Sequence, residues 1–222
     1  MVLKVYVAPL PSGGSPIVLL VLAEKQIPFE CIFVELTKKE TKTSDFLKMN
    51  PFGQVPVIDD DGFILYETRA ICRYLTEKYA AQGPALIPTS LNGKAVLEQA
   101  ASVELATFMP ALIKVGREAL KGTHGLAVDQ AVLDAALVEF GQKLDVYEVI
   151  LGKHKFIAGD ELTIVDFFHL IYAPGLATRV GIDIMTQASR PNVTRWWNVL
   201  IARPAWVKLQ AERAAANAVQ NV

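Results

Sequence analysis

Cysteine is scarce in this chain, and no apolar segment is long enough to cross a bilayer. Cys31 and Cys72 are the two cysteines in 222 residues, and they form neither a CxxC pair nor part of a metal-ligand cluster. The longest apolar run covers residues 17–23, well short of the roughly 20 residues that a membrane-spanning helix needs. The N-terminus also lacks a secretory signal pattern, so we expect a reducing, cytoplasmic setting and no membrane contact.

An excess of charge of either sign is also missing. Lysine and arginine together number 22 against 23 acidic residues, and no basic block is present that would favour nucleic acid as a partner. The histidines His124, His154 and His169 lack the spacing of metal ligands. We therefore expect small-molecule partners and no metal, in a chain whose 52% hydrophobic content is ample for a packed core.

The first part of the chain alternates strand and helix patterns. Residues 3–8 and 29–36 have the length and β-branched content of strands, and residues 15–26 between them have helical length. Ser15 stands where an N-cap is expected, because Pro16 suits the first helical position. These segments predict a βαβ unit.

A hairpin and a helix are expected to follow. Residues 55–60 and 63–67 alternate like strands around Asp60-Asp61-Gly62, which is a turn signal. Thr68 then opens a segment with helical periodicity. The order βαβ-ββα predicts an α/β domain at residues 1–80, with a mixed four-stranded sheet covered by helices.

The second part of the chain is expected to be all helical. Residues 81–92 lose periodicity and contain glycine and proline, as linkers do. Apolar residues recur at helical spacing through residues 93–222, and Pro110 should bend the first long helix there. In "FIAGDELTIVDFFHL", Thr163 and Asp166 form a T-x-x-D capping box, so we assign Asp166 to helix initiation rather than to catalysis.

The Val55-Pro56 bond lies at the start of a predicted strand. Proline cannot continue a hydrogen-bond ladder, and it adopts the cis form in some tight turns. Val55 is thus left with free backbone groups that an extended peptide could pair with. A simple tight turn explains the same residues equally well.

Groups suited to an amino-acid ligand occur nearby in the sequence. Gln54 carries an amide that can bind a carboxylate, and Glu67-Thr68 opens a helix. Helix N-terminal amides attract a carboxylate, while the Glu67 side chain attracts an ammonium group. An ordinary N-cap remains the alternative explanation for Glu67-Thr68.

Four segments together resemble a cytosolic glutathione transferase, most closely of the phi class: "NPFGQVP", "ETRAI", "FIAGDELTIVDFFHL" and "RPNVTRWWNVLIARPAW". They occur in the family's order and cover nearly the whole chain. The resemblance implies a thioredoxin-like N-terminal domain that binds glutathione as co-substrate, an all-helical C-terminal domain and a homodimer. It also implies transfer of the glutathione thiolate to small hydrophobic electrophiles, with glutathione peroxidase activity as a related possibility.

The resemblance also assigns the glutathione-binding positions. Val55, ahead of the family's cis-proline Pro56, would pair with the cysteinyl unit. Lys42 and Gln54 would hold the glycine carboxylate, and Glu67 and Thr68 the γ-glutamyl group. Phe52 is an apolar side chain in a polar-flanked loop, and we expect it to pack against the partner chain, although packing within its own chain explains it nearly as well.

The catalytic serine falls in "APLPSGGSPIVLL", where this chain departs from the phi pattern. Counting back from the helix without a gap gives Ser12, with Ser15 as the alternative. Ser15 is already explained by capping. A hydroxyl donor and the positive end of the following helix would both lower the pKa of the glutathione thiol, whose thiolate is the nucleophile.

An apolar pocket should hold the electrophile. Candidate lining residues are Leu10, Pro11, Phe108, Met109, Leu112 and Ile113, although core packing explains the helical ones as readily. Two other functions compete with transfer. A thiol-disulfide oxidoreductase is disfavoured because no cysteine stands at the first helix N-terminus, and a non-catalytic module for binding or dimerisation is kept open by the unusual "LPSGGSP" loop.

Overall fold

The computed structural model describes residues 2–9 and 13–220, with side chains as far as residue 216. Contacts divide the chain into two compact units. The first contains residues 1–87 together with 203–222, and the second contains residues 88–202. The sequence-based division instead assigned all of residues 93–222 to the helical domain.

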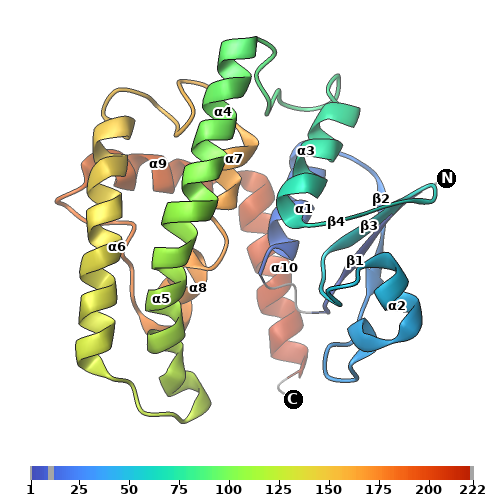
Figure 1. Cartoon of the computed structure of the whole chain (residues 1–222), viewed down its shortest axis with the longest axis horizontal. Helices are drawn as coiled ribbons and strands as arrows, with labels where there is room; N and C mark the ends of the chain where they lie inside the picture. Colours follow the sequence, from blue (N-terminus) through green and yellow to red (C-terminus); the bar gives the residue numbers. More distant parts are fainter. Residues whose placement is uncertain (1, 10–12, 221–222) are drawn as a thin grey trace. The chain divides into compact units, whose positions relative to one another are not determined.

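The first unit is built on a four-stranded mixed sheet (Figure 1). Its strands are β1 (Leu3–Val7), β2 (Phe29–Phe33), β3 (Val57–Asp60) and β4 (Phe63–Tyr66). They lie in the order β2-β1-β3-β4, with β1 parallel to β2 and antiparallel to β3. The predicted βαβ-ββα arrangement is confirmed.

Helices cover both faces of this sheet. They are α1 (Ser15–Glu24), α2 (Ser44–Met49) and α3 (Thr68–Lys78), with a short 3-10 turn η1 (Glu40–Lys42) before α2. In β1 the side chains of Leu3, Val5 and Val7 are buried, whereas the intervening residues are less so, as the period of a strand requires. On the α2 side, Phe46 packs in a cluster with Val57.

The β3–β4 hairpin turns where the sequence predicted. Asp60 pairs with Phe63, and both intervening residues, Asp61 and Gly62, have positive φ angles of 57° and 88°. Two-residue hairpin loops with two positive φ angles match the twist of the flanking strands, which explains the Asp-Gly pair. The carboxylate of Asp59 also accepts a bond from the Gly62 amide at 2.8 Å.

The second unit is helical. Its long elements are α4 (Leu91–Val103), α5 (Met109–Ala119), α6 (Gln130–Leu151) and α9 (Pro191–Ile201). Shorter ones are η2 (Glu104–Phe108), η3 (Leu120–His124), α7 (Ile164–Phe168) and α8 (Ala173–Val180). Residues 91–119 form one helical stretch that is long and apolar enough to span a membrane, but α4 packs on α7 and α5 packs on α6, as core helices do.

A wide turn separates α4 from α5. The segment η2 is a π-helix, and Pro110 stands at the start of α5 directly after it. Proline has no amide to close an ordinary helical turn, and a π-turn accommodates the resulting mismatch. The sequence predicted a bend at Pro110, and the structure has the π-turn directly before α5.

Buried aromatic rings and the capping box organise the core of this unit. The ring of Phe108 meets those of Phe140 and His169 edge to face, with centroids 5.1 and 4.6 Å apart. The fully buried Asp166 carboxylate accepts from the Thr163 amide at 2.8 Å and from the Trp196 Nε1 at 2.8 Å. The predicted capping box is confirmed, and Asp166 has a structural role.

The last helix, α10 (Pro204–Gln220), belongs to the first unit because it packs on α1. Just before α10, the Arg203 guanidinium pairs with both carboxylate oxygens of Glu24 at 2.6 and 2.5 Å. This contact joins residues 179 positions apart. Helical periodicity carries no information about such a partner.

Candidate functional site

The N-terminus of α3 lies against the loop that leads into α1. A Cβ atom added to Gly14 would lie 1.8 Å from Thr68 Oγ1, so no residue larger than glycine fits there without displacing the Thr68 side chain. Thr68 is the first residue of α3, and Glu67 precedes it with a φ of 73°. The starts of α1 and α3 are therefore in direct contact, although they are more than 50 residues apart in sequence.

The start of β3 borders the same place. The Val55-Pro56 peptide is cis, and the sheet register begins at Val57, which pairs with Tyr66 of β4. Because β3 and β4 are antiparallel, the residues just before Val57 lie beside those just after Tyr66. Val55 thus comes next to the start of α3, and its main chain lies outside the ladder.

Lys42 belongs to a fourth segment that lies near the start of β3. Its ammonium donates to the carbonyls of Phe52 and Gly53 at 3.2 and 3.0 Å. An ammonium group has three N–H donors, so these two bonds leave one donor over, and the next residue along the chain, Gln54, is exposed. The predicted binding residues Lys42, Gln54 and Val55 are consequently gathered in one loop region.

Asn50 shapes this loop and was missed by the sequence analysis. Its Nδ2 donates to the Gln54 carbonyl at 2.8 Å, and its Oδ1 accepts from the Phe52 amide at 3.0 Å. The Asn-Pro dipeptide at residues 50–51 is a turn signal that could have indicated it.

The serine predictions need one correction. Helix α1 begins at Ser15, its N-cap is Gly14, and the cap makes no side-chain hydrogen bond. Ser15 is therefore not the N-cap that the sequence predicted. Its hydroxyl is fully buried and has no hydrogen-bond partner among the described residues, while Ser12 lies outside them.

The expected electrophile-pocket residues have different environments. Leu10 and Pro11 lie outside the described residues. Phe108, Met109 and Leu112 are buried, at 0%, 6% and 0% exposure, whereas Ile113 is 37% exposed. Core packing accounts for the position of Phe108, and Ile113 is the most accessible of the four helical candidates.

Neither cysteine has the features of an activated thiol. Burial raises the pKa of the Cys72 thiol to about 12, and burial also raises the pKa of the Cys31 thiol. A thiol needs a lowered pKa to react as a thiolate near neutral pH. The thiol-disulfide oxidoreductase interpretation is weakened accordingly.

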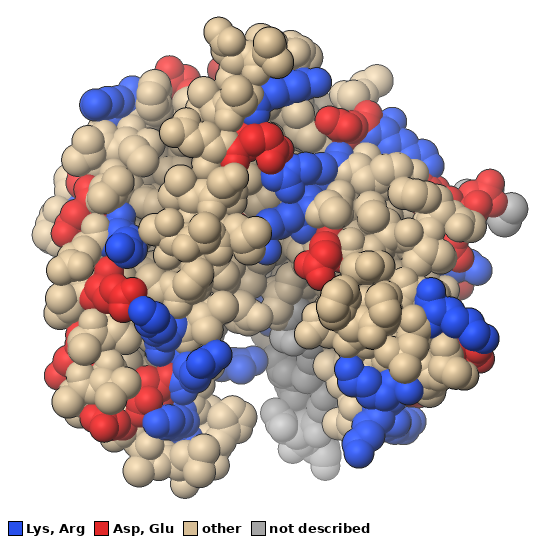
Figure 2. Space-filling model, viewed as in Figure 1, with Lys and Arg blue, Asp and Glu red and all other residues tan. Residues whose placement is uncertain are grey.

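In the described residues, neither the surface charges nor the possible metal ligands indicate a second functional site. Lys and Arg side chains are interspersed with Asp and Glu on the face drawn in Figure 2. Within residues 2–9 and 13–220, no three His, Cys, Asp or Glu side chains are grouped so as to hold a metal ion. The edge of the first unit that is formed by the start of α3, the start of β3 and the Lys42 loop thus remains the leading candidate.

Family comparisons agree with this geometry. The family model described as "Glutathione S-transferase, N-terminal domain" matches residues 1–77, and the corresponding C-terminal domain model matches residues 107–204. The chain belongs to the glutathione S-transferase family. Its relatives include plant phi-class enzymes, which confirms the class suggested by the four sequence segments.

Individual relatives are similar over almost their whole length. Glutathione S-transferase hmp2 of Hypomyces subiculosus is 40% identical over 96% of this chain and 99% of the relative. Glutathione S-transferase F11 of Arabidopsis thaliana is 40% identical over 94% and 97%.

Solved transferase structures have the same fold. Glutathione transferase F2 from Populus trichocarpa superposes with a TM-score of 0.87 at 38% identity, covering 96% of this chain and 99% of that one. Maize glutathione S-transferase I, solved in complex with an atrazine glutathione conjugate, superposes with a TM-score of 0.85 at 30% identity, covering 95% and 97%.

Proposed function

We propose that this transferase binds glutathione along the edge formed by the α3 N-terminus, the β3 start and the Lys42 loop, and conjugates its thiolate to small hydrophobic electrophiles. The observation that carries the proposal is the order of groups along this edge. Glu67 and Thr68 suit an α-amino acid head, Val55 offers free main-chain groups, and Lys42 and Gln54 suit a terminal carboxylate. That order matches the γ-glutamyl, cysteinyl and glycyl units of the tripeptide.

The maize relative supports the second half of the proposal, because it was solved in complex with an atrazine glutathione conjugate. In this chain, the contact between Gly14 and Thr68 keeps the α1 N-terminus close to the glutathione edge. The positive end of α1 favours an anion in that position. A thiolate bound there would be stabilised before any electrophile arrives.

A serine hydroxyl is proposed to donate to the same sulfur. Ser12 remains the first candidate, since the complete burial of Ser15 leaves a ligand no surface by which to reach its hydroxyl. A charge-assisted hydrogen bond of about 1.5–3 kcal/mol corresponds to roughly one to two pKa units. Peroxidase activity on organic hydroperoxides would use the same thiolate.

The decisive experiment is a titration of the thiolate absorbance of bound glutathione against pH in the wild type, Ser12→Ala and Ser15→Ala. Ser12→Ala should raise the thiol pKa by about one to two units and lower conjugation at neutral pH correspondingly. Ser15→Ala should leave the titration in place. It should also leave the melting temperature unchanged or slightly higher, because it removes a buried hydroxyl that has no partner among the described residues.

Two outcomes would contradict this assignment. A pKa shift in Ser15→Ala alone would move the donor role to Ser15. An unshifted titration in both variants, with glutathione still bound, would mean that serine does not activate the thiol and would favour a non-catalytic binding protein.

A further inference from the structure

A cavity of about 540 Å³ lies in the second unit, between α6 and the segment that leads into α9. Its size falls within the range of small-molecule sites. Apolar side chains form much of its wall: Leu137 and Val138 from α6, and Ile182 and Ile184 from the segment. None of these residues takes part in the glutathione site described above.

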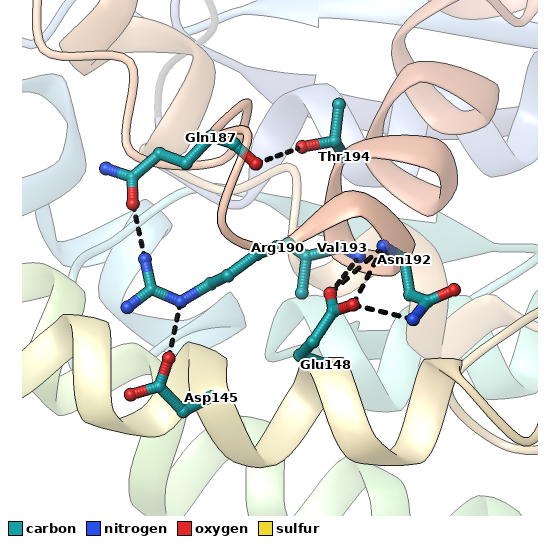
Figure 3. A network of polar contacts seen from close by, with 7 residues as sticks. All are labelled: Asp145, Glu148, Gln187, Arg190, Asn192, Val193 and Thr194. Carbon is teal, nitrogen blue, oxygen red and sulfur yellow. Dashed lines mark hydrogen bonds and ion pairs between the residues drawn. The ribbon is translucent and has the colours of Figure 1, made fainter.

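Arg190 is the cationic residue of the cavity lining and is held in place from two sides (Figure 3). Its Nε donates to Asp145 Oδ1 of α6 at 2.7 Å, and its Nη1 donates to Gln187 Oε1. The Arg190 side chain is only 14% exposed. The guanidinium is therefore a fixed group rather than a mobile surface charge.

Most of the donors on this guanidinium are unused by the protein. Arginine carries five N–H donors, and the bonds to Asp145 and Gln187 use two of them. In the described part of the chain, Nη2 has no acceptor. It lies against α6 at Gly141, where an added Cβ atom would be 3.1 Å away. Gly141 thus lets the guanidinium lie close to the helix, with donors available at the cavity.

The charges around the cavity restrict the ligand. Asp145 and Asp183 both line it with Arg190, so the three groups sum to one negative charge and disfavour an anion. The Asp183 carboxylate already accepts from the amides of Met185 and Thr186, both at 3.2 Å. A cation is disfavoured because both carboxylates are already engaged, Asp145 by Arg190 and Asp183 by these amides, while the spare donors at the cavity belong to the positively charged guanidinium.

We propose that this cavity is a second ligand site, separate from the glutathione edge, for an uncharged apolar molecule that carries a hydroxyl or carbonyl oxygen. The aliphatic wall contacts the apolar body of the ligand. The spare Arg190 donors bind its oxygen, because a hydrogen bond from an ionised donor is stronger than one from a neutral donor.

The test uses three naphthalene probes of similar size and different charge: naphthol, naphthoate and naphthylmethylammonium. Each is titrated calorimetrically into the full-length protein saturated with S-hexylglutathione, which keeps the probes out of the glutathione edge. Naphthol should bind saturably with a dissociation constant below about 1 mM, and more tightly than either charged probe. Equal binding of all three, tighter binding of a charged probe, or no binding of naphthol would overturn the proposal.

Matched variants locate the binding. Val138 lines the cavity and is 62% exposed, whereas Val149 lies on the same helix, is 60% exposed and is not part of the lining. Val138→Trp should weaken naphthol binding by about tenfold or more by filling the cavity, and Val149→Trp should leave it unchanged. Arg190→Lys, which keeps the charge and loses the planar fork, should also weaken it. Equal affinities in Val138→Trp and Val149→Trp would place the naphthol elsewhere.

Discussion

At the scale of single residues, the site depends on groups whose backbone positions are unusual. Glu67 has a φ of 73° and Val55 precedes a cis proline. A positive φ is uncommon for a residue other than glycine, and Val55 precedes Val57, where the pairing of β3 with β4 begins. Both residues therefore lie just outside regular structure at one edge of the sheet.

The role proposed for Glu67 can be measured directly. Glu67→Gln keeps the shape of the side chain but removes the charge expected to pair with the γ-glutamyl ammonium. Loss of a charge-assisted contact of about 1.5–3 kcal/mol should weaken glutathione binding by roughly tenfold to a hundredfold. Calorimetry gives the affinity directly, and Glu77→Gln in α3 is the matched control. An unchanged affinity in Glu67→Gln would place the γ-glutamyl group elsewhere.

At the scale of secondary-structure elements, helix ends are stabilised by partners distant in sequence. The Glu148 carboxylate on α6 accepts from the amides of Asn192 and Val193, at 3.0 and 3.0 Å, in the first turn of α9 (Figure 3). Arg195 on α9 donates in return to the carbonyl of Leu151, the last residue of α6, at 2.8 Å. Each helix thus caps the other, which fixes how α9 lies on α6.

Removing this cap should cost stability. Glu148→Ala leaves the part-buried amides of the first turn of α9 without this acceptor and should lower the free energy of unfolding by about 2 kcal/mol. For a chain of this length, that corresponds to a melting temperature roughly 4–8 °C lower.

The matched control is Glu139→Ala on the same helix. Glu139 pairs with Lys114 at 2.8 Å, with both side chains substantially exposed, and such pairs contribute less than about 1 kcal/mol. Equal losses of melting temperature in the two variants, measured by thermal unfolding, would show that Glu148 contributes no more than a surface ion pair.

At the scale of the whole molecule, an exposed aromatic ring points to self-association. Phe52 is 64% exposed, and its ring meets Tyr66 edge to face at 6.1 Å. A large apolar side chain in an otherwise polar loop is typical of an interface. We infer that two copies of the chain associate through a surface that includes Phe52.

Sedimentation velocity tests this inference. The wild type should sediment as a dimer at micromolar concentration, and Phe52→Ser should shift the equilibrium toward monomer. Phe63→Ser is the control, since Phe63 is also exposed, at 48%, but packs against Tyr74 of its own chain at 5.0 Å. A monomeric wild type would refute the inference, as would a dimer equally stable in both variants.

The sequence by itself determined the features that depend on neighbouring residues. The Asp-Gly turn, the Thr163–Asp166 capping box and the free position of Val55 before a proline follow from local backbone chemistry, and each could be predicted. The binding residues from Lys42 to Thr68 were assigned through the family resemblance, and their roles are still predictions.

Only the tertiary structure decided which distant groups meet. Gly14, and not the predicted Ser15, is the N-cap of α1, and Gly14 also lies against Thr68 at the start of α3. Helix α10 belongs to the first unit, and Arg203 just before it pairs with Glu24 of α1. Local preferences specify φ, ψ and the buried face of each element, whereas these contacts depend on how elements far apart in sequence pack. The physical reason is that periodicity identifies an apolar face without identifying its partner.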